Sequence, residues 1–277
     1  SQHCEVQAIA SRSIDRAKEA AATLGIPKAY GSYEELLADP AIEAVYNPLP
    51  NHLHVPWTLA AARAGKHVLC EKPFAMNANE AAAVREVAGK VHIMEAFMVR
   101  FHPQWLRARE LARSGALGDV RTVQAFFSYT NRQPSNIRNQ VETGGGALYD
   151  IGCYCVAAAR WFFDADITRA LALFDRDPEF GTDRRTTGLL ELGAGRHVAF
   201  SCATQSVGHQ RVHLYGTKGR VEITVPFNQP ETTPCIYFTH YGSSLDGIDQ
   251  VRHEVPTANQ YTLEGAWFST LVREQTP

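Results

Sequence analysis

The sequence predicts an α/β protein in which a doubly wound parallel sheet is followed by an α+β domain with a mostly antiparallel sheet. Up to about residue 100, short apolar runs alternate with segments of helical period, which is typical of stacked β-α-β units. Beyond that point strands accumulate with few helices between them, and the pattern changes around Met98–Pro103. We therefore expect two domains, of residues 1–100 and 101–277.

The first domain is expected to begin with a strand at Glu5–Ala10 and a helix at Ser13–Leu24, which Gly25 closes as its C-cap. Ser32-Tyr33-Glu34-Glu35 matches a capping box and opens a helix that stops near Pro40. The remaining elements alternate in the same way, with strands at Ala44–Asn47, His67–Cys70 and His92–Ala96 and helices at His54–Ala64 and Asn79–Ala88. Parallel strands joined by helical crossovers make a doubly wound sheet.

The second domain is expected to open with a helix at Pro103–Arg113. One long apolar segment, Ala147–Phe163, has the length of a buried helix, and Tyr261–Arg273 forms the last helix. The strands are expected at Val120–Tyr129, Thr187–Leu192, His197–Gln205, Arg211–Tyr215, Arg220–Val225 and Cys235–Thr239.

The composition argues against several classes of protein. The formal net charge of -2 lacks the basic excess that nucleic acid or an anionic membrane surface would require. No apolar run approaches the ~20 residues of a membrane helix, and Ser1–Glu5 does not resemble a signal peptide. The six cysteines lack the paired spacing of a zinc or redox site. We therefore expect free buried thiols in a cytoplasmic protein.

Lys72 is the first candidate for chemistry, because Cys70-Glu71-Lys72-Pro73 directly follows a predicted strand. In open α/β sheets, ligands bind beyond the carboxyl ends of the strands. A lysine there can hydrogen-bond a substrate hydroxyl and, if partly desolvated, take part in proton transfer. The alternative is a surface lysine in a turn stiffened by Pro73.

The segment from Gly144 to Tyr154 is the second candidate. Its three consecutive glycines indicate a flexible approach or a close backbone contact with a ligand. Asp150 and Tyr154 are four residues apart, so on a helix they share one face. A nearby lysine cation favours the phenolate, which makes a tyrosine a usable acid–base near neutral pH. The alternative is a core helix with an aspartate near its start and a tyrosine tethered by its hydroxyl.

Ser11 and Arg12 follow the first visible strand, where a dinucleotide fold meets the adenosine ribose. A carboxylate at this place suits a free 2′-hydroxyl, whereas an arginine suits a 2′-phosphate. The pair therefore favours NADP over NAD. The alternative is a helix-capping serine and a solvated arginine.

The turn after the strand Ala44–Asn47 contains Pro48, Leu49, Asn51 and His54. Prolines stiffen it at an edge of the sheet where backbone contacts with a cofactor are common. Its two histidines lack the spacing of a helical metal pair, and no carboxylate or cysteine completes a set, so we expect no metal site.

Together these segments resemble the Gfo/Idh/MocA oxidoreductase family. The resemblance spans nearly the whole chain and is carried by Ser32–Leu37, Pro50–His54, Ala64–Pro73 and Gly144–Tyr154. It implies an N-terminal Rossmann domain and a C-terminal domain whose open-faced sheet often forms oligomers, here a homodimer or homotetramer. It also implies that Lys72 is the catalytic lysine and that Glu71 and the turn Asn47–His54 lie near the cofactor.

Many members of the family have a histidine where this chain has Tyr154. In this respect the chain resembles the branch that includes dimeric dihydrodiol dehydrogenase, D-xylose dehydrogenase and glucose–fructose oxidoreductase. The segment Glu95–Pro103 resembles the same branch and implies that Arg100 contacts cofactor or substrate. The sequence departs from the family in having no G-x-G-x-x-G turn. We expect it to be a fragment that lacks the first Rossmann strand and the glycine-rich turn.

These expectations combine into an NADP-dependent dehydrogenase that acts on a cyclic polyol, either an aldose oxidised at C1 or a trans-dihydrodiol. Tyr154 would remove the hydroxyl proton, Lys72 would hold that hydroxyl and favour the phenolate, and Asp150 would bind a neighbouring hydroxyl or position the site. Asn131, Arg132 and Arg138 are candidates for selecting the substrate. One alternative is another substrate on the same scaffold, such as a sugar nucleotide or a biliverdin-like molecule. The other is a non-catalytic NADP-binding sensor or an inactive fragment.

Overall fold

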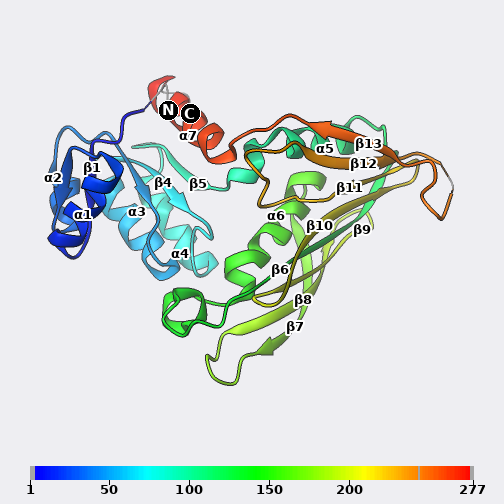
Figure 1. Ribbon diagram of the computed structural model, residues 1–277, viewed down its shortest axis with the longest axis horizontal. Helices are drawn as coiled ribbons and strands as arrows, with labels where there is room; N and C mark the ends of the chain where they lie inside the picture. The colour runs from blue at the N-terminus through cyan, green and yellow to red at the C-terminus, as the bar shows by residue number, and fades with distance from the viewer. Residues whose placement is uncertain (1–3, 243, 275–277) are drawn as a thin grey trace. The chain divides into compact units, whose positions relative to one another are not determined.

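A computed structural model describes residues 4–242 and 244–274 of the chain, which divide into two compact units (Figure 1). The first unit contains the residues up to Phe97 together with those from Glu264 onward, and the second unit contains Met98–Leu263. The end of helix α7 (Gln260–Glu274) belongs to the first unit because Phe268 packs there with Leu69 and Ala96. The second unit thus ends at Leu263, whereas the expected second domain runs to residue 277.

Local signals in the sequence account for the helices of the first unit. Helix α1 (Ile14–Leu24) is capped by the Ser13 side chain and ends at Gly25, which has the left-handed φ of 67°. Helix α2 (Tyr33–Ala38) begins with the predicted capping box. The Ser32 hydroxyl accepts from Glu35 N at 3.1 Å, and the Glu35 carboxylate accepts from Gly31 N at 3.0 Å.

All strands of the first unit pair in parallel, which confirms the predicted Rossmann-type arrangement. They form two sheets, β1 (Ala8–Ala10) with β2 (Lys28–Tyr30), and β3 (Ala44–Asn47), β4 (His67–Glu71) and β5 (Ile93–Ala96) in that order. Val68 and Cys70 of β4 are fully buried and pack against Ala61 of helix α3 (His54–Arg63). Helix α4 (Ala78–Ala83) is shorter than expected, because Val84–Val87 continues as a 3-10 turn.

The second unit contains an eight-stranded sheet in the order β13-β12-β11-β10-β6-β9-β8-β7. Neighbouring strands are antiparallel except for β6 and β9, so the sheet is mostly antiparallel as predicted. Two edge strands, β7 and β13, escaped the sequence analysis because most of their residues are exposed and they show no buried–exposed alternation. The strands are β6 (Val120–Thr130), β7 (Ile167–Arg176), β8 (Asp183–Leu192), β9 (Arg196–Ala203), β10 (Gln205–Gly216), β11 (Arg220–Ile223), β12 (Cys235–His240) and β13 (Val251–Val255).

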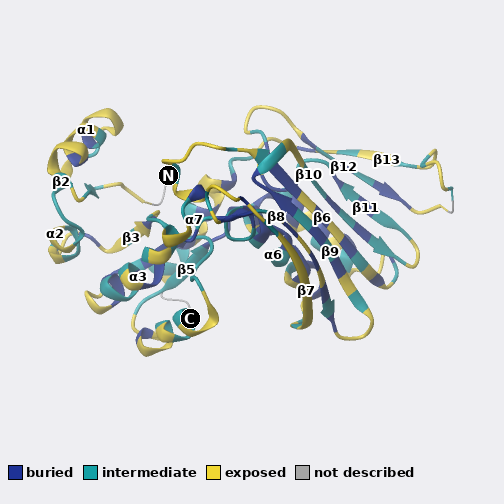
Figure 2. Cartoon of the chain, turned by 90° about the horizontal axis from the view of Figure 1, so that it is seen from below, coloured by how far each residue is buried: buried dark blue, intermediate teal, exposed yellow. Residues whose placement is uncertain are grey.

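Among the described residues of the second unit, helices cover one face of this sheet. Helix α6 (Cys153–Phe163) packs on β6 and β9, and helix α5 (Pro103–Arg113) packs on α6. Side chains alternate accordingly along β6, with Val123 and Phe127 buried and Phe126 exposed. On the opposite face the register aligns Leu171 with Leu189, and both are exposed, as is Leu173. Figure 2 shows the edge strand β7 largely in the colour of exposed residues.

Candidate active site

Glu71, Lys72 and Pro73 lie at the carboxyl end of β4, as the sequence predicted. The Glu71 carboxylate accepts from the Tyr46 hydroxyl at 2.7 Å and from the backbone N–H of Lys72 at 3.1 Å. The peptide bond between Lys72 and Pro73 is cis. At the end of the neighbouring strand β5, the Glu95 carboxylate accepts from Phe74 N at 3.0 Å. Carboxylates from two adjacent strands therefore fix the backbone on either side of Lys72.

His54 ties the turn that follows β3 to the segment that follows β4. The ring is buried, its Nε2 lies 2.6 Å from the carbonyl oxygen of Leu49, and its Nδ1 lies 2.8 Å from that of Pro73. Asn47 is also buried and binds both ends of the same turn, donating to His54 O and accepting from Leu49 N. Two of the predicted cofactor contacts, Asn47 and His54, fix the shape of this turn through their own hydrogen bonds. Pro48 is exposed, and Leu49 and Asn51 are half-buried.

Ser11 and Arg12 lie between β1 and α1, as predicted. The Ser11 hydroxyl accepts from Ser13 N at 3.3 Å, and Ser13 in turn caps the helix. The Arg12 side chain is exposed and makes no hydrogen bond or ion pair with the residues that the structure describes. This short connection thus presents an arginine and a serine hydroxyl without an acidic residue beside them.

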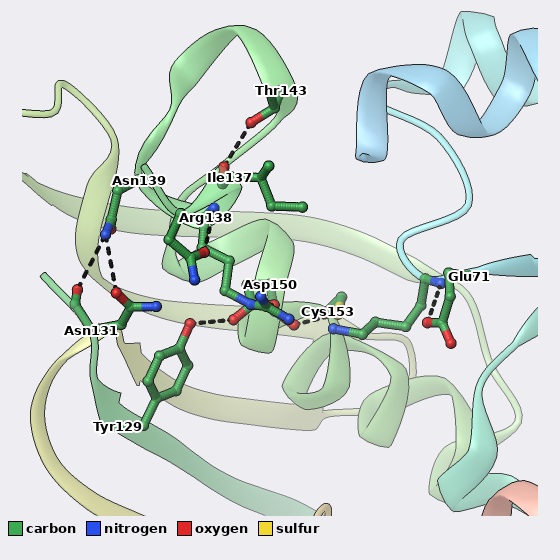
Figure 3. A network of polar contacts seen from close by, with 11 residues as sticks. Glu71, Tyr129, Asn131, Ile137, Arg138, Asn139, Thr143, Asp150 and Cys153 are labelled. Atoms are coloured by element: carbon green, nitrogen blue, oxygen red, sulfur yellow. Dashed lines mark hydrogen bonds and ion pairs between the residues drawn. The ribbon is translucent and has the colours of Figure 1, made fainter. Parts of the chain in front are cut away.

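Asp150 is the centre of a polar network in the second unit (Figure 3). Its Oδ2 accepts from the Tyr129 hydroxyl at 2.5 Å, and its Oδ1 accepts from Nε of Arg138 at 3.0 Å. Burial, followed by the charge of Asp150, raises the pKa of Tyr129 above its usual range. The charge of Asp150 raises the pKa of Arg138, and Tyr129 and Tyr154 add smaller contributions. Both oxygens of Asp150 therefore bind other side chains of the protein.

Tyr154 lies near the start of helix α6 and is buried. Its ring packs against Phe127 and Phe227, with centroids 5.8 and 5.4 Å away, and its hydroxyl lies 3.4 Å from the sulfur of Met98. The predicted stacking with Asp150 assumed one continuous α-helix. A π-helical turn at Leu148–Gly152 precedes α6 instead, so the four-residue spacing does not correspond to one regular α-helical repeat.

The glycines before this helix approach other parts of the protein closely, so no ligand is needed to explain why glycine stands at these positions. A Cβ at Gly145 would lie 2.5 Å from the carbonyl oxygen of Arg138, and one at Gly146 would lie 2.0 Å from Oδ1 of Asp183. Asp183 is buried and accepts from Leu148 N at 2.8 Å. The glycines thus let the loop before Asp150 approach β8 closely, a role that the sequence alone did not indicate because Asp183 lies 35 residues beyond Leu148.

Arg100 is exposed, and its guanidinium lies 5.4 Å from the centroid of the Trp161 ring. This cation–π contact holds the arginine on the surface of the second unit.

The six cysteines are free, as expected from their spacing, although Cys4 is exposed. Burial raises the pKa of Cys70 and of Cys202 to about 12, which keeps these thiols protonated. Among the described residues, no group of histidine, cysteine, aspartate and glutamate side chains could hold a metal ion. None of the described helices has the length and apolar character needed to cross a membrane.

Comparison with known proteins identifies both parts of the chain. Residues 1–100 match the model of an oxidoreductase family with an NAD-binding Rossmann fold, and residues 105–222 match that of the GFO/IDH/MocA C-terminal domain. The NADP-dependent D-xylose 1-dehydrogenase 2 of Haloferax volcanii is 45% identical over 262 residues, which cover 91% of this chain and 79% of that enzyme. The mouse trans-1,2-dihydrobenzene-1,2-diol dehydrogenase is 38% identical over 224 residues, 79% of this chain and 66% of that enzyme.

Among solved structures, a 3-ketoreductase of Actinomadura kijaniata in complex with NADP and TDP-benzene superposes with a TM-score of 0.90 at 30% identity. The match covers 98% of this chain and 82% of that one. The same enzyme has been crystallised with a tyrosine replaced by phenylalanine and with a lysine replaced by alanine. With these matches spanning both units, the chain belongs to the Gfo/Idh/MocA family of NAD(P)-dependent oxidoreductases.

Proposed function

We propose that this oxidoreductase is an NADP-dependent dehydrogenase that oxidises a hydroxyl group of a cyclic polyol, either the C1 hydroxyl of an aldose or one hydroxyl of a trans-dihydrodiol. Support for this substrate class comes from relatives that are identical to this chain at more than a third of the aligned residues, a D-xylose dehydrogenase and trans-dihydrodiol dehydrogenases. One feature of the chain itself carries the assignment. Tyr154 is a buried phenol whose ring packs against those of Phe127 and Phe227 near the start of α6.

The residues present fit NADP as the cofactor. Arg12 is exposed at the end of β1 with no partner among the described residues, and no carboxylate of Ser11–Ser13 competes for it. A guanidinium in that position suits a 2′-phosphate. The fixed turn Asn47–Asn51 and the anchored Glu71 would bind other parts of the cofactor, and Arg100 is a further candidate contact. When bound, NADP supplies the hydride acceptor.

In this proposal Tyr154 takes the proton from the reacting hydroxyl, and Lys72 holds the same hydroxyl by a hydrogen bond. The phenolate of Tyr154 would be favoured by the positive charge of Lys72. Its apolar neighbours Phe127 and Phe227 exclude water from one side of the ring. Asp150 acts as a positioning residue, since both of its oxygens already accept from Tyr129 and Arg138.

The experiment that tests the proposal compares Tyr154→Phe with Lys72→Met in the purified protein, following NADPH absorbance with D-xylose and with a trans-dihydrodiol. Loss of a positioned acid–base lowers kcat by about 100- to 10,000-fold. NADPH affinity, measured by fluorescence, should stay unchanged in Tyr154→Phe. Tyr241→Phe is the matched control, because Tyr241 is exposed on the surface of the second unit.

Three outcomes would count against the proposal. Near-normal turnover by Tyr154→Phe would remove its central residue. Turnover of a sugar nucleotide but of no free polyol would replace the substrate class. Tight binding of NADPH without turnover of any substrate would indicate a sensor instead of an enzyme.

We also propose that the chain forms homo-oligomers through the open face of the eight-stranded sheet. Leu173 is 79% exposed and Leu189 is 55% exposed, and both side chains lie on the face that neither α5 nor α6 covers. Contiguous exposed apolar side chains of this kind mark protein–protein interfaces.

A further inference from the structure

Arg138 is held at both its backbone and its side chain before any ligand arrives. Its carbonyl oxygen accepts from Gly146 N at 2.9 Å, and its own N–H donates to Oδ1 of Asn136 at 3.0 Å. Nε donates to Asp150 at 3.0 Å. An arginine fixed in this way has already lost most of the rotamer freedom that binding would otherwise cost.

Most N–H groups of the Arg138 guanidinium donate to none of the described residues. A guanidinium has five N–H donors in a planar fork, and the bond to Asp150 uses the one on Nε. The terminal nitrogens Nη1 and Nη2 bind none of the residues 4–242 and 244–274, and the side chain is 46% exposed. The figure of the network shows the guanidinium beside Asp150 (Figure 3). Four N–H donors on the two Nη nitrogens therefore remain available for an external partner.

The charge of the network indicates the kind of partner. Asp150 already pairs with Arg138, so the pair has no net charge and does not require an anion to balance it. N–H donors whose positive charge is already balanced can donate to a neutral hydroxyl oxygen of a substrate.

We infer that Arg138 is a specificity-determining residue whose Nη groups bind the hydroxyl adjacent to the one that Tyr154 deprotonates, so that the enzyme selects vicinal diols. This inference rests on the proposed function. In this inference Asp150 is a positioning residue, because its hydrogen bond to Nε orients the guanidinium of Arg138.

In this inference Arg132, the other arginine named above as a candidate for selecting the substrate, takes no part in selection and provides a matched control in the same loop. It has the same side chain but pairs with Glu179 at 3.7 Å, where both side chains are more than 60% exposed. Its removal changes the charge of the loop by the same amount as removal of Arg138.

The experiment combines a protein variant with a substrate analogue. The kcat/KM values of wild type, Arg138→Gln, Arg138→Lys and Arg132→Gln are compared for D-xylose and 2-deoxy-D-xylose, and for trans-cyclohexane-1,2-diol and cyclohexanol. A lost hydrogen bond to a charged group lowers kcat/KM by about 10- to 100-fold. We expect Arg138→Gln to show that loss with the diol of each pair and to change the deoxy analogue by less than about threefold, because both changes remove the same contact. Arg138→Lys should recover part of the loss, and Arg132→Gln should match wild type.

Calorimetric titration of the same sugars and alcohols into the NADPH-loaded protein separates this inference from the proposed function, because no turnover occurs in that complex. Weaker diol binding by Arg138→Gln supports the inference even if no polyol is oxidised, a result that would overturn the proposed function alone. Equal losses with the diol and the deoxy analogue would indicate a purely structural role for Arg138 and overturn the inference. Unchanged diol affinity in Arg138→Gln would overturn it as well, and no diol binding by the wild type would overturn both.

Discussion

The carboxylate of Asp183 lies so close to Gly146 that a β-carbon at residue 146 would come within 2.0 Å of Oδ1. Gly146 also has a φ of 119°, a conformation that side-chain-bearing residues rarely adopt. Since Asp183 caps the helical segment at Leu148, this one approach sets where the helix that carries Asp150 and Tyr154 begins.

Replacing Gly146 with alanine should therefore destabilise the fold by at least about 2 kcal/mol, through backbone strain and displacement of Asp183. Chemical denaturation measures the change. The control is Gly193→Ala, where a Cβ meets open space and φ is not positive. Equal stability of the two alanine variants would contradict the close approach.

Loss of the His54 ring should loosen two segments at once. His54→Ala removes the partner of the Leu49 and Pro73 carbonyls, and unpaired buried groups of this kind cost about 1–3 kcal/mol each. We expect a clear loss of stability in denaturant and weaker NADPH binding. His52→Ala, two residues earlier and exposed, should change stability by less than about 0.5 kcal/mol. Wild-type stability of His54→Ala would show that the turn does not need its tether.

His102 makes the fold sensitive to acid. Burial lowers the pKa of His102 from 6.5 to about 4, so the native state binds its proton later than the unfolded chain does. The stabilisation is fully present above pH 6.5 and is lost as the pH falls towards 4, by about 3 kcal/mol in total. His102→Asn, which can still accept from Gln104 N as the helix cap, should flatten the fall in melting temperature over this range. His209→Asn, at an exposed site, should leave it as steep as in wild type.

Arg12 should decide between the two nicotinamide dinucleotides. Arg12→Ala removes a charge-assisted pair with the 2′-phosphate, so the Kd for NADPH should rise by about 10- to 100-fold while that for NADH stays the same. Fluorescence titration measures both values. Lys18→Ala, which removes an exposed positive charge from α1, should change neither. A parallel loss of NADH affinity in Arg12→Ala would argue against recognition of the phosphate.

Leu173→Glu should dissociate the proposed oligomer, because it adds a charge to the open face of the sheet. Sedimentation velocity would then show a smaller species than for the wild type. Leu24 is also exposed, at 66%, but lies on α1 of the first unit, so Leu24→Glu is the control. A wild-type monomer would overturn the proposed oligomer.

The parts of the fold that the sequence predicted are those with local causes. Ser32 and Glu35 form their capping box within four residues, and Gly25 ends its helix where its own backbone requires it. The strands β7 and β13 were missed because a strand exposed at a sheet edge shows no alternation between apolar and polar residues.

The roles of the candidate site residues stay predictions, and the residues themselves were identified for a local reason. The motifs around Lys72 and Tyr154 are continuous in sequence, so a resemblance could identify them. The partners that fix the site come from other elements: Tyr129 lies on β6, Arg138 follows in a loop, and Asp183 belongs to β8. No periodicity connects residues 12 to 35 positions apart, so only the folded chain brings them together.

The single parallel pair in the large sheet, β6 with β9, has a consequence for how this protein folds. These two central strands are joined by a long crossover that contains α6, β7 and β8, and hence both Tyr154 and Asp183. Pairings between strands so distant in sequence form slowly, because the intervening chain must be ordered first. The helix that carries Tyr154, the proposed acid–base, therefore reaches its final place only when the centre of the sheet closes. Activity should appear during refolding in the slowest phase, together with burial of the sheet and not before it.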